Sequence, residues 1–350
     1  MNADAHRPPY LRIATEEAWA PPEAIALYRD HLASRDLDDI GFNSLMGYFL
    51  NSPHPQPRAV VERLQDAAER RISDMDATGI DHQVLALTSP GTQVLPPEEA
   101  VTLAEIANAR LGEICRTRPE RFSGLGTVSF TDAATDVAEL RRAVGEHGLK
   151  GLMLNDHVRG DHLDHPRFAP LLRELEDLDV PLYLHPGTPP NAMIAPYREA
   201  GLDGAILGFG ASAGLHLLRI ITSGVFDRHP RLRLVVGHLG EALPFWLHRI
   251  DHMHAKQVAS GRYEAIKPLA QRPSEYFRSH IWLTTSGMPW EPAILFTREV
   301  TGPDRVMYAM DYPYQFEADE VTAQDALPIS DAEKADFFEH TARRVFNLTF

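Results

Sequence analysis

The stretch Arg305-Val306-Met307-Tyr308-Ala309-Met310-Asp311-Tyr312-Pro313-Tyr314 decides the fold. It begins as an apolar run of strand-forming residues and ends at a carboxylate, an aromatic ring and a proline, which stops a paired strand. In a barrel of parallel strands, side chains at the C-terminal strand ends form the active site. Taken alone, the motif rather indicates a turn capped by Asp311. The rest of the chain instead favours a strand over 306–310 with Asp311 in a site.

Apolar strands alternate with amphipathic helices along the chain. Strands are predicted over 11–15, 83–88, 122–128, 151–154, 180–185, 232–238, 281–285 and 306–310. Helices are predicted over 58–78, 97–116, 131–147, 168–178, 242–257, 291–301 and 331–346, with another inside 202–223. Such alternation implies parallel pairing and predicts an α/β fold, a (β/α)8 TIM barrel. The alternative, an open doubly wound sheet, usually has a glycine-rich phosphate turn after its first strand, and Glu16-Glu17-Ala18-Trp19 is not one.

A single domain is expected over 1–350, with its core over 11–347. We find no internal repeat and no linker that would divide the chain. Residues 30–57 have weak periodicity and many turn-forming residues. This predicts a long, partly irregular insertion after the first strand, near the mouth of the barrel.

The composition narrows the class of protein. The net charge of -15 makes a nucleic-acid backbone an unfavourable partner. Cys115 is the only cysteine, so an intrachain disulfide is excluded, which fits a reducing cytoplasm. Residues 1–10 lack the apolar core of a signal peptide, and no apolar run approaches the ~20 residues of a membrane span. We therefore expect a soluble, cytoplasmic protein without nucleic-acid or membrane partners.

Four ionisable residues fall at predicted strand ends. Glu16 follows the first strand, His185 ends the fifth, His238 ends the sixth and Asp311 follows the eighth. Two carboxylates and an imidazole suit Zn²⁺, Mn²⁺ or Mg²⁺, and three protein ligands are typical of a catalytic metal site. His238 is then the neighbour that moves protons or holds substrate charge. Singly, each histidine could be a core residue with satisfied hydrogen bonds, and Glu16 and Glu17 could cap a following helix; together on one rim, they favour a metal site.

The order of these strand-end residues resembles the amidohydrolase superfamily. Most members open with His-x-His after the first strand, whereas Glu16-Glu17-Ala18 stands there in this chain. It is similar instead to the decarboxylase branch, the aminocarboxymuconate-semialdehyde decarboxylase-like proteins, which includes the 2,3-dihydroxybenzoate and γ-resorcylate decarboxylases. Ala18 cannot bind a metal, and Lys150 precedes the fourth strand rather than following it. The resemblance therefore implies one divalent metal per chain, Mn²⁺ first, with Zn²⁺ or Mg²⁺ as alternatives, and no organic cofactor.

Within that branch, several stretches resemble the 5-carboxyvanillate decarboxylases. They are 11–18, 74–81, 86–91, 200–206, 236–244 and 308–315. The resemblance implies a carboxy-lyase that removes CO₂ without oxidation from a phenolic acid, 5-carboxyvanillate, to give vanillate in lignin-derived aromatic catabolism. The alternatives are a decarboxylase for γ-resorcylate or 2,3-dihydroxybenzoate, a metal-dependent lactone or amide hydrolase, and a non-enzymatic barrel with a relic site.

The resemblance also implies residue roles. Glu16, His185 and Asp311 would be the metal ligands, with Asp311 also the proton donor to the ring carbon. His238 would stabilise the developing charge, and Glu241 would orient His238. For Glu241, compensation of a helix dipole is the alternative interpretation.

Further residues are expected to bind the substrate, a small aromatic carboxylate close to a dianion. Three can supply positive charge: Arg58 follows the insertion, and His216 and Arg219 lie one turn apart on a predicted helix. In the resembling branch an arginine can come from an adjacent subunit, which implies a homodimer or a homotetramer with an arginine shared across the interface. For Arg219, a solvated helix residue is the alternative. The residues expected to wall the pocket or contact the ring are Thr88, Tyr314, Tyr48 and Phe209.

Overall fold

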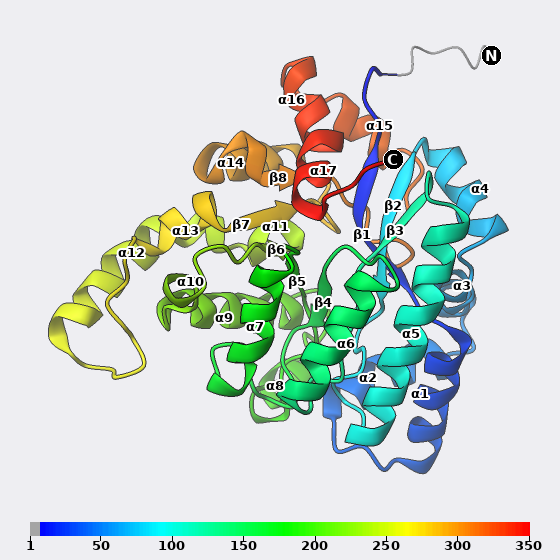
Figure 1. Cartoon of the computed structure of the whole chain (residues 1–350), viewed down its shortest axis with the longest axis horizontal. Coiled ribbons are helices and arrows are strands. Elements are labelled where there is room, and N and C mark those ends of the chain that lie inside the picture. Colours follow the sequence, from blue (N-terminus) through cyan, green and yellow to red (C-terminus); the bar gives the residue numbers. More distant parts are fainter. Residues whose placement is uncertain (1–7) are drawn as a thin grey trace.

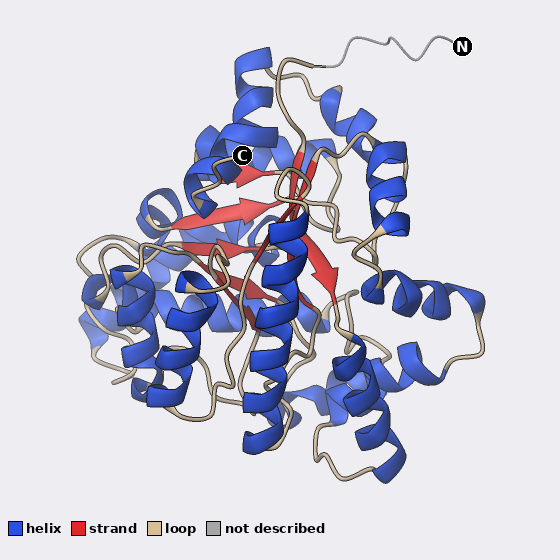
Figure 2. Cartoon of the chain, turned by 45° about the vertical axis from the view of Figure 1, so that its right-hand side comes forward, coloured by secondary structure: helices blue, strands red, loops and turns tan. Residues whose placement is uncertain are grey.

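Eight parallel strands form the wall of a barrel at the centre of the molecule (Figure 2), and the computed structural model describes residues 8–350. Hydrogen bonds pair β1 (Ile13–Trp19), β2 (His82–Leu87) and β3 (Phe122–Gly124). A second set contains β4 (Leu152–Asn155), β5 (Leu182–His185), β6 (Leu234–Val236), β7 (Ile281–Thr284) and β8 (Val306–Met307). The Gly126–Leu152 bridge connects the two sets at one side, and the Thr15 N–H donates to the Tyr308 carbonyl at the other, 3.2 Å away. The predicted (β/α)8 arrangement is confirmed.

Helices surround this barrel (Figure 1). They are α1 (Pro22–Ser34), α2 (Ile40–Asn51), α3 (Pro55–Gln65), α4 (Glu69–Thr78), α5 (Pro97–Thr117), α6 (Ala133–Gly145), α7 (Ala169–Asp177), α8 (Asn191–Glu199), α9 (Gly208–Thr222), α10 (Val225–Arg228), α11 (His238–Glu241), α12 (Leu243–Ser260), α13 (Pro273–Ser279), α14 (Glu291–Thr301), α15 (Glu320–Asp325), α16 (Asp331–Ala335) and α17 (Thr341–Phe346). Short 3₁₀ turns lie at Pro166–Phe168 and Pro303–Arg305, and a π-helical turn, Asp336–His340, precedes α17.

Helix α5 shows why these residues form these elements. Pro97 occupies its first position, where no backbone N–H is needed, and Glu98 and Glu99 lie in its first turn, where they complement the helix dipole. Leu103, Ala107 and Leu111 recur at helical spacing and are buried. The predicted helix over 97–116 is confirmed within one residue.

The barrel interior is mostly apolar at the N-terminal ends of the strands. Met153, Tyr183, Val235 and Met307 pack there, and Phe346 from α17 stacks on the Tyr183 ring at a centroid distance of 6.5 Å. Because α17 closes this end, the polar residues of the interior are left at the opposite, C-terminal ends of the strands.

Several predicted boundaries are wrong. Residues 30–57 are irregular only at 35–39 and 52–54, because they also contain the end of α1, all of α2 and the start of α3. The Asp39 side chain caps α2 by accepting the Phe42 N–H at 2.7 Å. The helix predicted over 58–78 is broken between α3 and α4, where the Asp66 side chain accepts the Ala68 N–H at 2.7 Å. β8 ends at Met307 rather than at residue 310.

No helix within residues 8–350 is long and apolar enough to cross a membrane. The sequence predicts no signal peptide over residues 1–10. Most of this segment, residues 1–7, lies outside the described residues, so the structure does not test the prediction.

Candidate active site

Strand β1 carries two adjacent glutamates with different environments. The strand was predicted to end at Thr15 but continues to Trp19, and its pairing register with β2 shifts between Ala14 and Glu17. Neighbouring side chains on a strand point to opposite faces. Glu16 contacts Tyr183 and Thr284 inside the barrel, whereas Glu17 contacts Gln83 of β2. Both are buried within the strand, so the alternative that they cap a helix is wrong.

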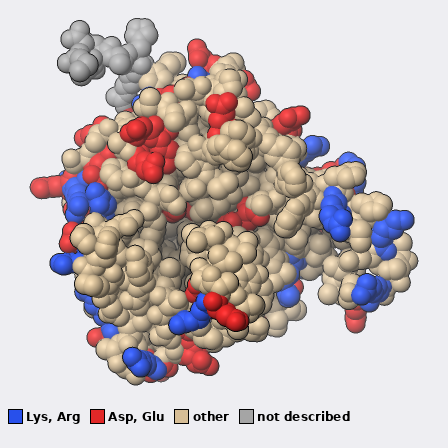
Figure 3. Space-filling model, turned by 180° about the vertical axis from the view of Figure 1, so that it is seen from behind, with Lys and Arg blue, Asp and Glu red and all other residues tan. Residues whose placement is uncertain are grey.

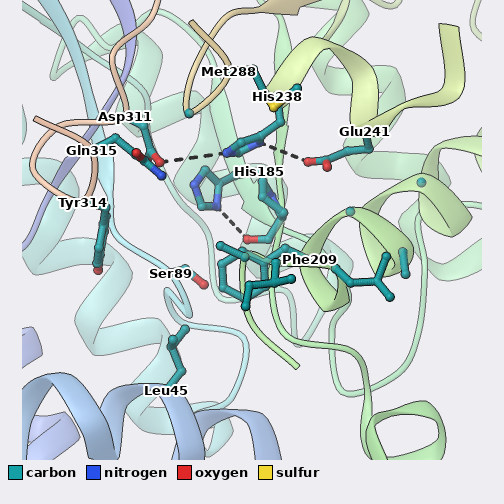
Figure 4. A pocket seen from close by; sticks show the side chains of 18 of the residues that line it. Leu45, Ser89, His185, Phe209, His238, Glu241, Met288, Asp311, Tyr314 and Gln315 are labelled. Atoms are coloured by element: carbon teal, nitrogen blue, oxygen red, sulfur yellow. Dashed lines mark hydrogen bonds and ion pairs between the residues drawn. The ribbon is translucent and has the colours of Figure 1, made fainter. Parts of the chain in front are cut away.

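The side chains of Glu16, His185 and Asp311 converge at the C-terminal ends of β1, β5 and β8. One potential ligand atom from each lies within 4.8 Å of the others. His185 donates Nδ1–H to the Pro186 carbonyl at 2.7 Å (Figure 4). This leaves Nε2 free, 3.5 Å from Glu16 Oε1. Burial lowers the pKa of His185 and so favours the neutral imidazole that a metal needs.

The two oxygens of Glu16 differ in a way that fits a cation. Oε2 accepts hydrogen bonds from the Tyr183 hydroxyl and from the Thr284 hydroxyl, the latter at 2.9 Å. Oε1 is buried and has no hydrogen-bond partner among the described residues. A buried carboxylate oxygen without a donor is costly unless something positive meets it. The two carboxylates and the imidazole therefore fit one divalent cation.

Tyr183 and Thr284, the hydroxyl donors to Glu16, were not foreseen from the sequence. The signal for Tyr183 was present, because it lies two residues before His185 on the same strand and so on the same face. Partners of this kind orient metal ligands and tune their affinity.

His238 and Glu241 lie on a left-handed turn. His238, Leu239, Gly240 and Glu241 have φ of 52°, 54°, 75° and 54°. For non-glycine residues this conformation costs about 1–2 kcal/mol each, and such strain is typical of functional sites. The turn begins at Gly237, where a Cβ would lie 2.5 Å from Glu16 Oε2, so glycine is required there. The strand predicted to run to His238 thus ends earlier, at Val236.

Three carboxylates surround the imidazole of His238. Its Nδ1 lies 3.1 Å from Glu241 Oε1, and its Nε2 lies 4.0 Å from Asp311 Oδ2 (Figure 4). The same Nε2 lies 3.9 Å from Glu16 Oε1. Burial alone would lower the pKa of His238, but the Glu241, Glu16 and Asp311 carboxylates raise it to about 10. His238 is therefore suited to carry a positive charge next to a bound anion.

A pocket with a volume of about 750 Å³ opens above these residues. His185, His238, Glu241 and Asp311 lie at its base, and apolar side chains make up most of its wall. Charged side chains lie mainly at the margins of the face shown in Figure 3, around an uncharged area with a hollow that contains acidic atoms. An apolar wall with a few polar groups is typical of a site for a small organic molecule.

The structure brings together most of the residues expected to contact a ring. Tyr48, Phe209 and Tyr314 line the pocket. Thr88 does not line it, but its hydroxyl is hydrogen-bonded to the Tyr314 hydroxyl at 2.7 Å. Three polar lining residues were missed from the sequence: Gln56, Ser89 and Gln315. Ser89 and Gln315 each directly follow an expected residue.

The expected cations lie elsewhere. His216 is fully buried, donates from Nδ1 towards Asp156 at 3.2 Å and accepts the Leu163 N–H at Nε2. Arg219 forms a bidentate ion pair with Asp164, with N–O distances of 2.9 and 2.8 Å. Arg58 is exposed and adjoins Pro57, a lining residue. Within residues 8–350, no Lys or Arg lines the pocket.

Comparisons with known proteins agree with this geometry. The amidohydrolase family model matches residues 3–348. The chain is 50% identical to a 5-carboxyvanillate decarboxylase from Novosphingobium aromaticivorans of known structure, with a TM-score of 0.95 and 97% of each chain covered. That structure holds manganese and 4-hydroxy-3-methoxy-5-nitrobenzoic acid. A γ-resorcylate decarboxylase from Rhizobium sp. is 31% identical over 345 residues, 96% of this chain and 98% of that protein. A dihydroxybenzoic acid decarboxylase structure from Polaromonas sp. with manganese and 2-nitroresorcinol is 28% identical, with a TM-score of 0.84 and 97% of each chain covered.

Proposed function

The chain belongs to the amidohydrolase family, and we propose that it catalyses the metal-dependent, non-oxidative decarboxylation of 5-carboxyvanillate to vanillate. The observation that carries the proposal is the convergence of Glu16, His185 and Asp311 below a largely apolar pocket. The 50%-identical decarboxylase supports the substrate, because its bound nitrobenzoate is vanillate with a nitro group where the substrate has its second carboxylate. Such a reaction belongs to the catabolism of lignin-derived aromatic acids.

The proposed cofactor is one divalent cation per chain, held by Glu16 Oε1, His185 Nε2 and Asp311. Mn²⁺ is the first choice because the solved structures of two similar decarboxylases hold manganese. When bound, the cation would supply Lewis-acid chemistry that stabilises negative charge on the substrate.

We propose Asp311 as the proton carrier. Its carboxylate accepts the phenol proton of the substrate and delivers it to the ring carbon that bears the carboxylate. The carbon–carbon bond then breaks, its electron pair restores the aromatic ring, and CO₂ leaves. Burial raises the pKa of the Asp311 carboxyl, while the His238 imidazole acts in the opposite direction.

The remaining pocket residues bind and orient the substrate in this proposal. The cationic form of His238 stabilises the negative charge that moves from the carboxylate into the ring as CO₂ leaves, and Glu241 Oε1, 3.1 Å from His238 Nδ1, orients the imidazole. Phe209 and Tyr314 contact the faces of the ring, and Tyr48 closes the pocket above it. Thr88 acts through Tyr314 by fixing the direction of its hydroxyl.

A second copy of the chain is the proposed partner. The substrate carries more negative charge than one histidine balances, yet no Lys or Arg among the described residues lines the pocket. Large apolar side chains are exposed at the mouth and beside it: Ile206 (80%), Leu207 (49%), Trp246 (52%), Phe245 (75%) and Trp290 (65%). Helix α12 extends away from the barrel (left side of Figure 1), where it can reach another subunit. We propose that a second subunit, in a homodimer or a homotetramer, covers this surface and contributes an arginine to the pocket. Arg58 of the same chain binds the substrate from the edge of the pocket in this proposal.

Cys115 as the only cysteine supports a cytoplasmic location, since no intrachain disulfide can form.

The test is a substrate panel. Purified protein reconstituted with Mn²⁺ is given 5-carboxyvanillate, γ-resorcylate or 2,3-dihydroxybenzoate, and the loss of ultraviolet absorbance of each acid is followed. We expect fast conversion of 5-carboxyvanillate and slow or no conversion of the other two. Conversion of none, together with the opening of lactone substrates, would replace the proposal by the hydrolase alternative.

A further inference from the structure

Glu17, the second of the adjacent glutamates on β1, lies directly behind Asp311. It is 1% exposed. Its Oε1 accepts the backbone N–H of Met310 at 3.0 Å, and its Oε2 accepts the backbone N–H of Tyr312 at 3.3 Å. Met310 and Tyr312 are the two residues on either side of Asp311, so one carboxylate spans the backbone from which the Asp311 side chain projects.

We propose that Glu17 is a positioning residue for Asp311: its carboxylate holds the Met310–Tyr312 backbone in the conformation that directs the Asp311 side chain into the pocket. The inference rests on the proposed role of Asp311 as metal ligand and proton carrier. Asp311 has a φ of 69°, in the left-handed region that non-glycine residues rarely adopt. A strained residue keeps such a conformation only where its surroundings impose it. The two N–H contacts of Glu17 are constraints of this kind.

A third donor fixes the Glu17 carboxylate itself. Gln83 Nε2 donates to Glu17 Oε2 at 3.3 Å, and Gln83 Oε1 accepts from Arg71 Nη1 at 3.2 Å. Arg71 is fully buried, and its guanidinium lies 4.5 Å from the Tyr312 ring centroid. Burial raises the pKa of Glu17, and the Met310 N–H and the Arg71 guanidinium act in the opposite direction. Arg71, Gln83 and Glu17 thus form a buried chain that ends on the backbone around Asp311.

The contacts distinguish this arrangement from an ordinary buried ion pair. The groups that donate to Glu17 are two backbone N–H groups and one amide, whereas the Arg71 guanidinium reaches the carboxylate through Gln83. Three N–H groups therefore point at two carboxylate oxygens. A glutamine at position 17 would have one oxygen and one NH₂ group, so its NH₂ would face at least one of these donors. Glu17→Gln keeps the size of the side chain but breaks the constraint.

The experiment measures Mn²⁺ affinity and turnover separately in Glu17→Gln. The Mn²⁺ Kd is measured without substrate, from the electron paramagnetic resonance signal of the free ion, and kcat and KM are measured with 5-carboxyvanillate. Because a displaced Asp311 carboxylate would bind the cation more weakly, we expect the Mn²⁺ Kd to rise about tenfold and kcat to fall about 10–100-fold. KM should stay within about threefold, because the pocket wall is unchanged.

Glu320→Gln is the matched control. Glu320 is another buried glutamate, 6% exposed, and it accepts a hydrogen bond from the Tyr308 hydroxyl at 3.4 Å on the same stretch of chain. Its contacts are with Tyr308 and Gln324 rather than with the backbone at 310–312. We expect this variant to keep wild-type Kd, kcat and KM.

The outcomes separate a positioning role for Glu17 from a merely structural one. A folded Glu17→Gln variant that binds Mn²⁺ with the wild-type Kd overturns the inference. A smaller number of Mn²⁺ sites per chain with an unchanged Kd also overturns it, because that is the result expected if Glu17 only stabilises the fold. If Glu17→Gln does not fold, Gln83→Met removes one donor from the carboxylate and decides instead, with an expected change in the same direction of about two- to fivefold. If the wild type releases CO₂ from none of the three acids, the proposed function fails, but the substrate-free Kd still tests Glu17.

Discussion

Removal of the Tyr183 hydroxyl should weaken metal binding without disturbing the barrel. In Tyr183→Phe the ring remains stacked on Phe346, but Glu16 Oε2 keeps only the Thr284 hydroxyl as donor. A hydrogen bond to a charged group contributes about 1.5–3 kcal/mol, and each 1.4 kcal/mol is about tenfold in an equilibrium constant. The Mn²⁺ Kd should therefore rise about 10–100-fold, which is also the usual cost of losing a partner of a metal ligand.

The assay is a Mn²⁺ titration of metal-free protein, with thermal unfolding recorded for each variant. Tyr308→Phe is the control, because it removes the hydroxyl of an equally buried tyrosine that donates to Glu320. It should bind Mn²⁺ as the wild type does. A Tyr183→Phe protein with a Kd within about twofold of the wild-type value would refute the reasoning that Tyr183 prepares Glu16 for the cation.

Three further predictions follow from the geometry. Gly237→Ala should abolish Mn²⁺ binding at concentrations that saturate the wild type, since the new Cβ would meet Glu16 Oε2 at 2.5 Å; stoichiometric binding in a titration would contradict this. Burial raises the pKa of Glu320 to about 8, so the folded chain keeps a proton that the unfolded chain releases near pH 4.3. The free energy of unfolding of the wild type therefore falls as the pH rises from about 4.3 to about 8. Glu320→Gln should thus gain unfolding free energy over the wild type in urea titrations from pH 5 to 9, reaching a few kcal/mol, and a pH-independent difference would count against it. Phe245→Glu combined with Trp290→Glu should shift sedimentation from dimer to monomer and raise KM, whereas an unchanged dimer would remove this surface from the proposed interface.

The architecture could be predicted because its signals are local. Apolar runs of strand length, separated by amphipathic helices, indicate parallel pairing whatever the details of each boundary. The rule that parallel strands present their C-terminal ends to one site then placed Glu16, His185, His238 and Asp311 together. The contact distances agree with this placement.

The errors arise where distant parts of the chain decide the local structure. The strand β1 continues past Glu16 and Glu17, and its register shift between Ala14 and Glu17 decides which of these two side chains faces the barrel interior. Five successive residues from His238 onward have positive φ. The only sign of this in the sequence of 237–242 is its two glycines. These features depend on packing against other strands, which helix and strand periodicity does not report.

The predicted cations illustrate the same limit. Helical spacing correctly suggested that His216 and Arg219 are neighbours on one helix. Their acidic partners, Asp156 and Asp164, come from the segment after β4, more than fifty residues earlier in the chain. Because these partners bind His216 and Arg219 within the subunit, the proposed cation of the pocket is Arg58 or an arginine of a second copy.

We propose that this chain removes CO₂ from 5-carboxyvanillate through a site that depends on one divalent cation. The most direct measurement is CO₂ release by metal-free protein, before and after the addition of one equivalent of Mn²⁺ per chain, with Asp311→Asn treated in parallel. We predict no release before addition, stoichiometric formation of vanillate and CO₂ afterwards, and no detectable turnover by Asp311→Asn. Full activity of the metal-free protein, or near-normal CO₂ release by Asp311→Asn, would contradict the account.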